Sequence, residues 1–188
     1  MEDIQKNIQI LLNLYKSKNL SKAELLNKEL IQVYPKVILL YNILGLILTD
    51  QNKIEDAINW YEKGIKIDPK YSMIYNNLGT VYKSQNDYNK AENYYKKSIK
   101  LDNKIPEPQN NLGNLFLLLN KYDDAIICFK KAININPDFF PSHYNLGRTY
   151  VNLGKFEDAK KHLKLSIKIN PLFSLAHRTL SGLIKYSK

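Results

Sequence analysis

The chain of 188 residues is poor in residues that form covalent or metal cross-links. It contains a single cysteine, Cys128, so no disulfide can form within the chain and no zinc site can be built from several cysteines. A lone cysteine is typical of a reducing compartment. We therefore expect a cytoplasmic protein.

Long apolar segments are also absent. The longest runs, such as LFLLL at 115–119, are far shorter than the roughly 20 residues that span a bilayer. The first residues, MEDIQKNIQI, begin acidic and show no basic segment followed by an apolar run and a cleavage site. The sequence thus predicts neither a transmembrane segment nor a signal peptide.

Acidic residues are outnumbered, since 18 Asp and Glu stand against 28 Lys and Arg, which gives a formal net charge of +10. Such a surplus leaves an acidic peptide, nucleic acid or an anionic membrane open as partners. The simpler hypothesis is that the lysines are only solvated. Because aromatic residues are not strongly interleaved with the lysines, we do not expect a nucleic-acid partner.

What the sequence does contain is a repeat of 34 residues. Leu-Gly pairs keep this spacing, and so do a column of alanines and a column of prolines. The members are Gly45, Gly79, Gly113 and Gly147 with the leucine before each; Ala23, Ala57, Ala91, Ala125 and Ala159; and Pro35, Pro69, Pro137 and Pro171, with Asn103 in the one gap. A fixed period of this length is the signature of repeat architectures.

Each repeat predicts two helices joined by a tight turn. In residues 38–71, one apolar stripe with helical spacing runs from Tyr41 to Leu48 and a second runs from Ala57 to Gly64. The turn between the two helices holds a residue that tolerates a left-handed backbone, which is Asn52, Asn86, Asn120 or Gly154. The closing prolines end the second helix. No strand pattern competes, so the fold is predicted to be all-α.

The histidines follow the repeat rather than a catalytic pattern. His143 and His177 are 34 residues apart and take the packing position that Tyr41 and Tyr75 fill in earlier repeats. His162 stands alone on a second helix, where its spacing does not suit a metal site. Glycine-rich phosphate loops and nucleophile elbows are lacking. We expect no enzyme activity, no cofactor and no metal.

These columns resemble the tetratricopeptide repeat (TPR) family, which has small residues where two helices cross, large aromatics between them and a closing proline. The resemblance implies one array over residues 1–188, an α-solenoid wound as a right-handed superhelix. The repeats are 4–37, 38–71, 72–105, 106–139 and 140–173, and residues 174–188 are expected to form a capping helix. The first repeat is degenerate, with Leu11 in the glycine position and Asn27 in the aromatic position.

In such arrays the first helix of each repeat lines a concave groove, so the resemblance implies where a ligand would bind. We expect residues opposite the apolar stripe of these helices to face the groove. The candidate groove residues are Asn42, Asn76, Asn77, Thr80, Lys83, Asn110, Asn111, Asn114, Tyr144, Asn145, Arg148 and Arg178.

Two interpretations of the asparagines stay open. An amide side chain offers both a donor and an acceptor, so a column at Asn77, Asn111 and Asn145 is suited to follow the backbone of an extended peptide. This column is similar to the asparagine ladder in the TPR region of protein O-GlcNAc transferases. Alternatively, asparagines before Leu-Gly are an ordinary feature of such repeats and have no ligand.

The carboxylate clamp of chaperone-binding TPR proteins is matched only in part. Asn114 and Asn145 fit its amide positions, whereas Asn110 and Leu175 stand where lysines are required. We therefore do not expect a standard binder of chaperone tails.

Two arginines give the end of the candidate groove a cationic character. Arg148 and Arg178 are suited to bind a carboxylate in their own way, because Arg forms paired charge-assisted hydrogen bonds with it. The alternatives are that they pair with acids such as Glu107 or Asp50, or that they are only solvated.

The same face is apolar in the first two repeats. Its residues are Ile8, Leu12, Tyr15, Leu39, Ile43 and Leu46. Exposed apolar patches usually mark an interface. Either the N-terminal helix or a second copy of the chain is expected to cover this patch.

We therefore expect a protein-interaction module that binds an extended peptide or protein segment, with an acidic or carboxylate group as one hypothesis for its chemistry. A second hypothesis is a substrate-docking region of a larger glycosyl- or sulfotransferase. It rests on AHRTLSGLIKYSK at 176–188, which resembles the end of TPR regions that precede sulfotransferase-like domains. A third is a scaffold that assembles with itself through the apolar face.

Overall fold

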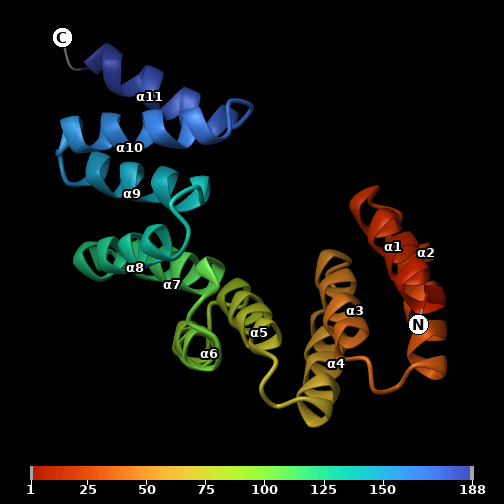
Figure 1. Ribbon diagram of the computed structural model, residues 1–188. Helices are drawn as coiled ribbons and strands as arrows, with labels where there is room; N and C mark the ends of the chain where they lie inside the picture. Colours follow the sequence, from red (N-terminus) through yellow and green to blue (C-terminus); the bar gives the residue numbers. More distant parts are fainter. Residues whose placement is uncertain (1, 187–188) are drawn as a thin grey trace. The chain divides into compact units, whose positions relative to one another are not determined.

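The computed structural model describes residues 2–186 and shows only helices as regular structure in that range (Figure 1). The helices are α1 (Glu2–Lys16), α2 (Leu20–Val33), α3 (Ile38–Asp50), α4 (Ile54–Ile67), α5 (Ser72–Ser84), α6 (Tyr88–Leu101), α7 (Pro106–Leu118), α8 (Tyr122–Ile135), α9 (Phe140–Asn152), α10 (Phe156–Ile169) and α11 (Ser174–Tyr186). Two helices fall in each expected repeat and one follows them, which confirms the all-α prediction. Residues 187–188 of the expected capping helix lie outside the described residues.

The chain divides into two compact units. Unit 1 is Met1–Asp87 and holds α1 to α5, and unit 2 is Tyr88–Lys188 and holds α6 to α11. The division falls inside the expected repeat 72–105, whose first helix belongs to unit 1 and whose second helix belongs to unit 2.

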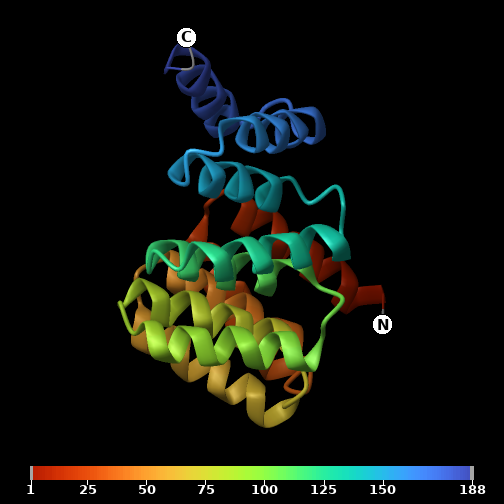
Figure 2. The same ribbon diagram turned by 90° about the vertical axis from the view of Figure 1, so that its left-hand side faces the viewer.

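Within each unit, every helix contacts the next one along the chain. The first helices of neighbouring repeats also touch, as α3 does α5 in unit 1 and α9 does both α7 and α11 in unit 2. Figure 2 shows α8 to α11 as successive layers, coloured from green to blue. This stacking brings side chains from different repeats onto one face.

The turn between the two helices of a repeat is left-handed, as predicted from its Asn and Gly residues. The φ angles are 62° at Asn52, 61° at Asn86, 57° at Asn120 and 70° at Gly154. Lys18 takes the same place in the degenerate first repeat with a φ of 58°. This conformation lets the next amide close the helix end, as when Lys53 N–H donates to Leu48 C=O at 2.9 Å.

The regular spacing of glycine and aromatic residues reflects a close helix crossing. A Cβ atom added at Gly45 would lie 2.2 Å from Tyr61 Cε1, and one at Gly113 would lie 2.6 Å from Phe129 Cε1. The first repeat reverses the sizes, because its large residue Leu11 is on the first helix and its smaller residue Asn27 is on the second. Both are fully buried.

The packing histidines hold the end of the preceding helix. Nε2 of His143 donates to the carbonyl of Pro137 at 3.0 Å, and His177 does the same to Pro171 at 2.9 Å. The phenol groups of Tyr41 and Tyr75 make the equivalent hydrogen bond in unit 1, to Pro35 and Pro69, both at 2.9 Å. The closing proline therefore supplies a carbonyl acceptor as well as a helix stop.

Candidate functional site

Most of the candidate asparagines are buried and bonded to one another. Asn77 Nδ2 donates to Asn42 Oδ1 at 2.8 Å, and this bond joins α5 to α3 in unit 1. Asn145 Nδ2 donates to Asn110 Oδ1 at 2.9 Å, and this bond joins α9 to α7 in unit 2. The four residues are only 6% to 9% exposed.

The two units therefore share one hydrogen-bond pattern between neighbouring repeats. The first asparagine of one repeat accepts a hydrogen bond from the second asparagine of the next repeat. Asn76, 5% exposed, donates to Asn77 Oδ1 at 3.3 Å, and the buried Ser142 hydroxyl donates to Asn110 Oδ1 at 3.0 Å. Buried amides that find partners inside the fold favour the packing interpretation for these positions.

The other two candidates from α5, Thr80 and Lys83, are more accessible to solvent than the asparagines. Thr80 is exposed, and its hydroxyl donates to the Asn76 carbonyl of its own helix at 3.3 Å. Lys83 is half-buried, and burial lowers the pKa of its ammonium group. Both side chains are more accessible than the paired asparagines.

The accessible candidates of unit 2 come from α7, α9 and α11. Arg148 and Arg178 are exposed, and Asn111, Asn114 and Tyr144 are half-buried. We call these five residues the arginine face. Its three helices are neighbours, because α9 contacts both α7 and α11.

Aromatic contacts hold the centre of the arginine face. The Arg148 guanidinium carbon lies 5.6 Å from the centroid of the Tyr144 ring, a cation–π contact. The Tyr144 ring meets the edge of Phe173 at a centroid distance of 5.0 Å. Neither Arg148 nor Arg178 has a carboxylate within ion-pair distance among the described residues. Asp50, one acid considered as their partner, pairs instead with Lys18 Nζ at 2.7 Å.

The apolar residues of the first two repeats are largely covered within unit 1. Ile43 is 3% exposed, and the remaining five are half-buried: Ile8, Leu12, Tyr15, Leu39 and Leu46. Burial, followed by the charge of Asp50 and a hydrogen bond to it, raises the pKa of the Tyr15 phenol to about 12. The patch is thus smaller than the sequence pattern indicates.

The sequence pattern did not reveal that two histidines, His143 and His162, are in contact. The prediction that His162 stands alone is wrong, because its Nδ1 lies 3.1 Å from Nδ1 of His143 and the two rings stack. Burial, with a further contribution from His143, lowers the pKa of His162 to about 4. The pair joins α9 to α10 over 19 residues, a separation that carries no periodic signal.

Hollows in unit 2 lie away from the arginine face. One of about 430 Å³ is lined by residues from Pro137 to Ile169, including His143. Two others, of about 340 and 480 Å³, lie along α6, the first of them between α6, α7 and α8. No cluster of three metal-binding side chains is found among the described residues. Nor is any helix within residues 2–186 both long and apolar enough to cross a membrane.

Comparisons with known protein families find tetratricopeptide repeats over most of the chain. A model described as TPR repeat matches residues 45–86 and 113–154, and two models described as tetratricopeptide repeat match 72–104 and 140–171. These matches cover the strong repeats and leave the degenerate first one out. A comparison with curated protein sequences finds no match.

Solved structures of low sequence identity share the fold. TTC0263, a TPR protein of Thermus thermophilus, superposes with a TM-score of 0.81 at 15% identity, over 96% of this chain and 98% of that one. The protein pilF of Pseudomonas aeruginosa gives 0.77 at 17% identity, over 95% and 87% of the two chains. YrrB, described as a TPR protein with an unusual peptide-binding site, gives 0.63 at 20% identity, over 92% and 89%.

Proposed function

Because the chain belongs to the tetratricopeptide repeat family, we propose that it is a non-enzymatic protein-interaction module and that its arginine face binds a peptide or protein segment carrying a carboxylate. The family matches and the all-helical fold support an interaction module. The arginine face supports the chemistry of the partner. A cytoplasmic location is part of the same proposal.

One observation carries the proposal. Arg148 and Arg178 are exposed cations without a carboxylate partner among the described residues, whereas the buried asparagines beside them are already paired. A guanidinium group forms paired, charge-assisted hydrogen bonds with a carboxylate. The contact with Tyr144 restricts the Arg148 side chain, so less conformational entropy is lost when a ligand binds.

Neighbouring groups suit the rest of an extended segment. Asn114 offers a donor and an acceptor for a peptide backbone, and the Tyr144 and Phe173 rings offer an apolar surface. The protein YrrB, which shares the fold, is described as having an unusual peptide-binding site. A site built from Arg and aromatic groups in place of a standard clamp is consistent with that precedent.

The test is a fluorescence-anisotropy screen against a library of peptides with free C-terminal carboxylates. We expect the best peptide to bind about tenfold more weakly to Arg148→Ala. Lys22→Ala, which removes an exposed cation from α2 in unit 1, is the matched control and should bind normally. Equal losses in the two variants would mean that only net charge matters, and the proposal would be wrong.

Self-assembly through the apolar face stays a second hypothesis. Five of its six residues are half-buried, so they retain some accessible surface. Light scattering on the wild type and on Leu12→Glu distinguishes the cases, since a monomeric wild type rules this hypothesis out. The hypothesis of a linked transferase also stays a prediction.

A further inference from the structure

The positive charge is concentrated in unit 2. Residues 88–188 hold 17 Lys and Arg against 8 Asp and Glu, whereas residues 1–87 hold 11 against 10. The second helices of the repeats account for much of this difference. In α6, α8 and α10 there are 10 lysines and 5 acids, and in α2 and α4 there are 4 lysines and 5 acids.

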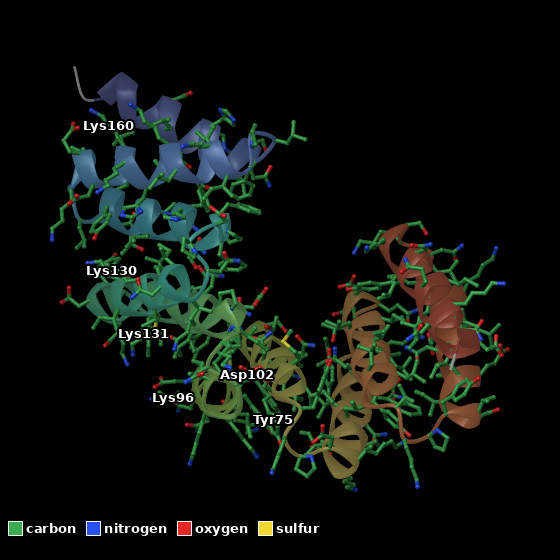
Figure 3. The ribbon with its side chains drawn as sticks, viewed as in Figure 1. Tyr75, Lys96, Asp102, Lys130, Lys131 and Lys160 are labelled. Carbon is green, nitrogen blue, oxygen red and sulfur yellow. The ribbon has the colours of Figure 1, made fainter. Side chains whose placement is uncertain are left out.

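The lysines of unit 2 lie in register. Lys96, Lys130 and Lys164 are 34 residues apart, so they take the same position on α6, α8 and α10, and Lys97 and Lys131 form a second column beside them. Figure 3 shows Lys96, Lys130, Lys131 and Lys160 on one side of unit 2. We call this surface the lysine face, and it consists of Lys96, Lys97, Lys100, Lys130, Lys131, Lys160, Lys161 and Lys164.

Acids of unit 2 neutralise this face only locally. Glu92 pairs with Lys96 at 2.6 Å and Glu157 pairs with Lys160 at 2.9 Å, each within one helix. Lys130 and Lys131 of α8, and Lys161 and Lys164 of α10, have no carboxylate within ion-pair distance among the described residues. A surplus of cations therefore remains on the surface.

A partly apolar hollow opens within the lysine face. It measures about 340 Å³ and lies between α6, α7 and α8. Its lining includes four apolar side chains (Ile99, Leu112, Phe116 and Ile127), two lysines (Lys96 and Lys131), the amide of Gln109 and the carboxylate of Asp124. Ile127 is 51% exposed. Cys128, also in the lining, is buried, and burial raises the pKa of its thiol to about 11. It therefore contributes a neutral wall.

A second hollow extends the first along α6. It measures about 480 Å³, is lined by Lys96, Lys97, Lys100 and Leu101, and shares Lys96 with the first hollow. Asp124 lines the first hollow and Glu92 pairs with Lys96 beside it, so the net positive charge comes from Lys131 and the lysines further along the face. An apolar anchor in the hollow thus has cations on its flanks.

We propose that the lysine face is a second binding surface, distinct from the arginine face, and that it takes an acidic protein segment whose bulky apolar side chain enters the hollow between α6, α7 and α8. Carboxylates of the segment contact Lys100, Lys130 and Lys131. Opposite charges steer such a segment to the face, and burial of the apolar side chain holds it there.

The geometry favours a protein segment over other anions. Single-stranded nucleic acid is held by aromatic platforms on which bases stack, and the one aromatic side chain in the lining of the hollow, Phe116, is buried. A membrane surface is held by apolar side chains that protrude into it, whereas here they line a hollow. A side chain of the size of Phe fits a hollow of this kind.

The test is fluorescence anisotropy at low salt with a labelled peptide of sequence EEEFEEE. The intact chain is titrated against this probe, against EEEAEEE, against a thymidine oligonucleotide of matched charge and against phosphatidylserine vesicles. We expect EEEFEEE to bind at least fivefold more tightly than EEEAEEE. Equal affinities of the two peptides would overturn the proposal, because the face would then attract charge alone.

Variants locate the binding. The double variant Lys130→Glu, Lys131→Glu is expected to weaken EEEFEEE binding at least tenfold. The matched control reverses the charges of Lys63 and Lys66 on α4 to Glu, and it should leave the binding unchanged. Ile127→Ser should abolish the preference for Phe over Ala.

Leu118→Ser is the control for the hollow, because Leu118 on α7 is similarly exposed, at 55%, and lies outside the lining. Its variant should keep the preference for the Phe peptide. Tighter binding of the oligonucleotide or the vesicles, lost in the Lys130→Glu, Lys131→Glu variant, would assign the face to that partner and overturn the proposal.

Discussion

Unit 1 and unit 2 are built from the same repeat but differ in how they use charged residues. In unit 1, two ion pairs join separate parts of the chain, since Glu24 on α2 contacts Lys53 at 2.9 Å and Lys18 contacts Asp50 on α3 at 2.7 Å. Glu24 also pairs with Lys28 within α2, at 2.6 Å. In unit 2, the pairs of Glu92 and Glu157 lie within single helices and many lysines are left over. Helix packing fixes the repeat, so surface charge is free to differ between units.

The two units also differ in which polar groups are accessible. Both units bury a pair of asparagines between the first helices of neighbouring repeats. Only unit 2 adds exposed arginines beside that pair. The paired asparagines therefore have a packing role in both units, and the proposed ligand contacts come from neighbouring residues.

The largest effect is expected where the helices cross. Gly113→Leu in unit 2 places a Cβ atom 2.6 Å from the buried Phe129 ring, and we expect a loss of about 3 to 4 kcal/mol in the free energy of unfolding. Adding Phe129→Asn copies the Leu11 and Asn27 arrangement of unit 1 and should recover part of the loss. Urea unfolding measures both.

The control for this comparison is Gly182→Ala. A Cβ at Gly182 meets nothing within 4 Å, so the variant should gain roughly 0.5 to 1 kcal/mol from helix propensity. If Gly113→Leu is as well tolerated as Gly182→Ala, then close crossing is not the reason for the glycine column.

The next largest effect concerns the asparagine pairs. Asn77→Leu leaves the buried Asn42 amide without its partner, so we expect a loss of about 2 kcal/mol in unfolding free energy. Adding Asn42→Leu should restore part of it, because the Asn42–Asn77 pair is then gone while Asn76 Nδ2 has lost Asn77 Oδ1 as an acceptor. The measurement is a double-mutant cycle by chemical unfolding.

The same cycle in unit 2 should also recover only part of the loss. Replacing both Asn110 and Asn145 by Leu leaves the buried Ser142 hydroxyl without the amide oxygen that accepts its hydrogen bond. Additive losses in unit 1, with no recovery in the double variant, would contradict the pairing and leave the amides available for a ligand.

Acidification should affect the two units in different pH ranges. The pKa of His162 in unit 2 is about 4 in the folded chain and 6.5 in the reference state, because burial and the nearby His143 disfavour its charged form. The unfolded chain therefore binds more protons between these values, and stability falls by about 1 to 2 kcal/mol as the pH drops from 6.5 to 4. His162→Leu should remove this loss.

Unit 1 should respond at lower pH. Burial alone would raise the pKa of Glu24, but hydrogen bonds from Lys28, Lys53 and Gln51 outweigh it and lower the pKa to about 2. Its stabilising effect is present above pH 4.5 and is lost as the pH falls toward 2, by about 1 kcal/mol after solvent screening at the lysines. Hydrogen exchange assigns each loss of stability to its unit. If unit 1 lost stability at a higher pH than unit 2, the account would be wrong.

The sequence predicted the architecture because the repeat encodes it directly. The period placed the helices and the left-handed turns at Asn52, Asn120 and Gly154, and the structure confirms them. Family matches cover the strong repeats alone. The turn at Lys18 in the first repeat carries no Asn or Gly signal, so the pattern did not reveal it.

The candidate site was harder to predict from the sequence. Asn77 and Asn145 lie opposite the apolar stripe, so helical periodicity placed them on the groove side. Their hydrogen bonds cross to another repeat, and one helix's periodicity says nothing about what the next repeat presents. The contact between His143 and His162 joins the two helices of one repeat, and the periodicity of one helix does not show which side chain of the other helix it meets.

The smallest effect is expected at Asn27 in unit 1. Both polar atoms of its fully buried side chain are without a hydrogen-bond partner among the described residues. Asn27→Leu has a similar volume and removes the unpaired amide, so we expect a gain of about 1 kcal/mol in thermal or urea unfolding. A loss of stability would show that the amide has a partner.

The central claim is that ligand chemistry lies in unit 2 while the paired asparagines are structural. The most direct measurement is the shift of backbone amide NMR signals when the best peptide from the library is added. We predict shifts centred on α9 and α11 around Arg148 and Arg178. Shifts centred on α1 and α3 of unit 1, with Arg148 unaffected, would contradict the account.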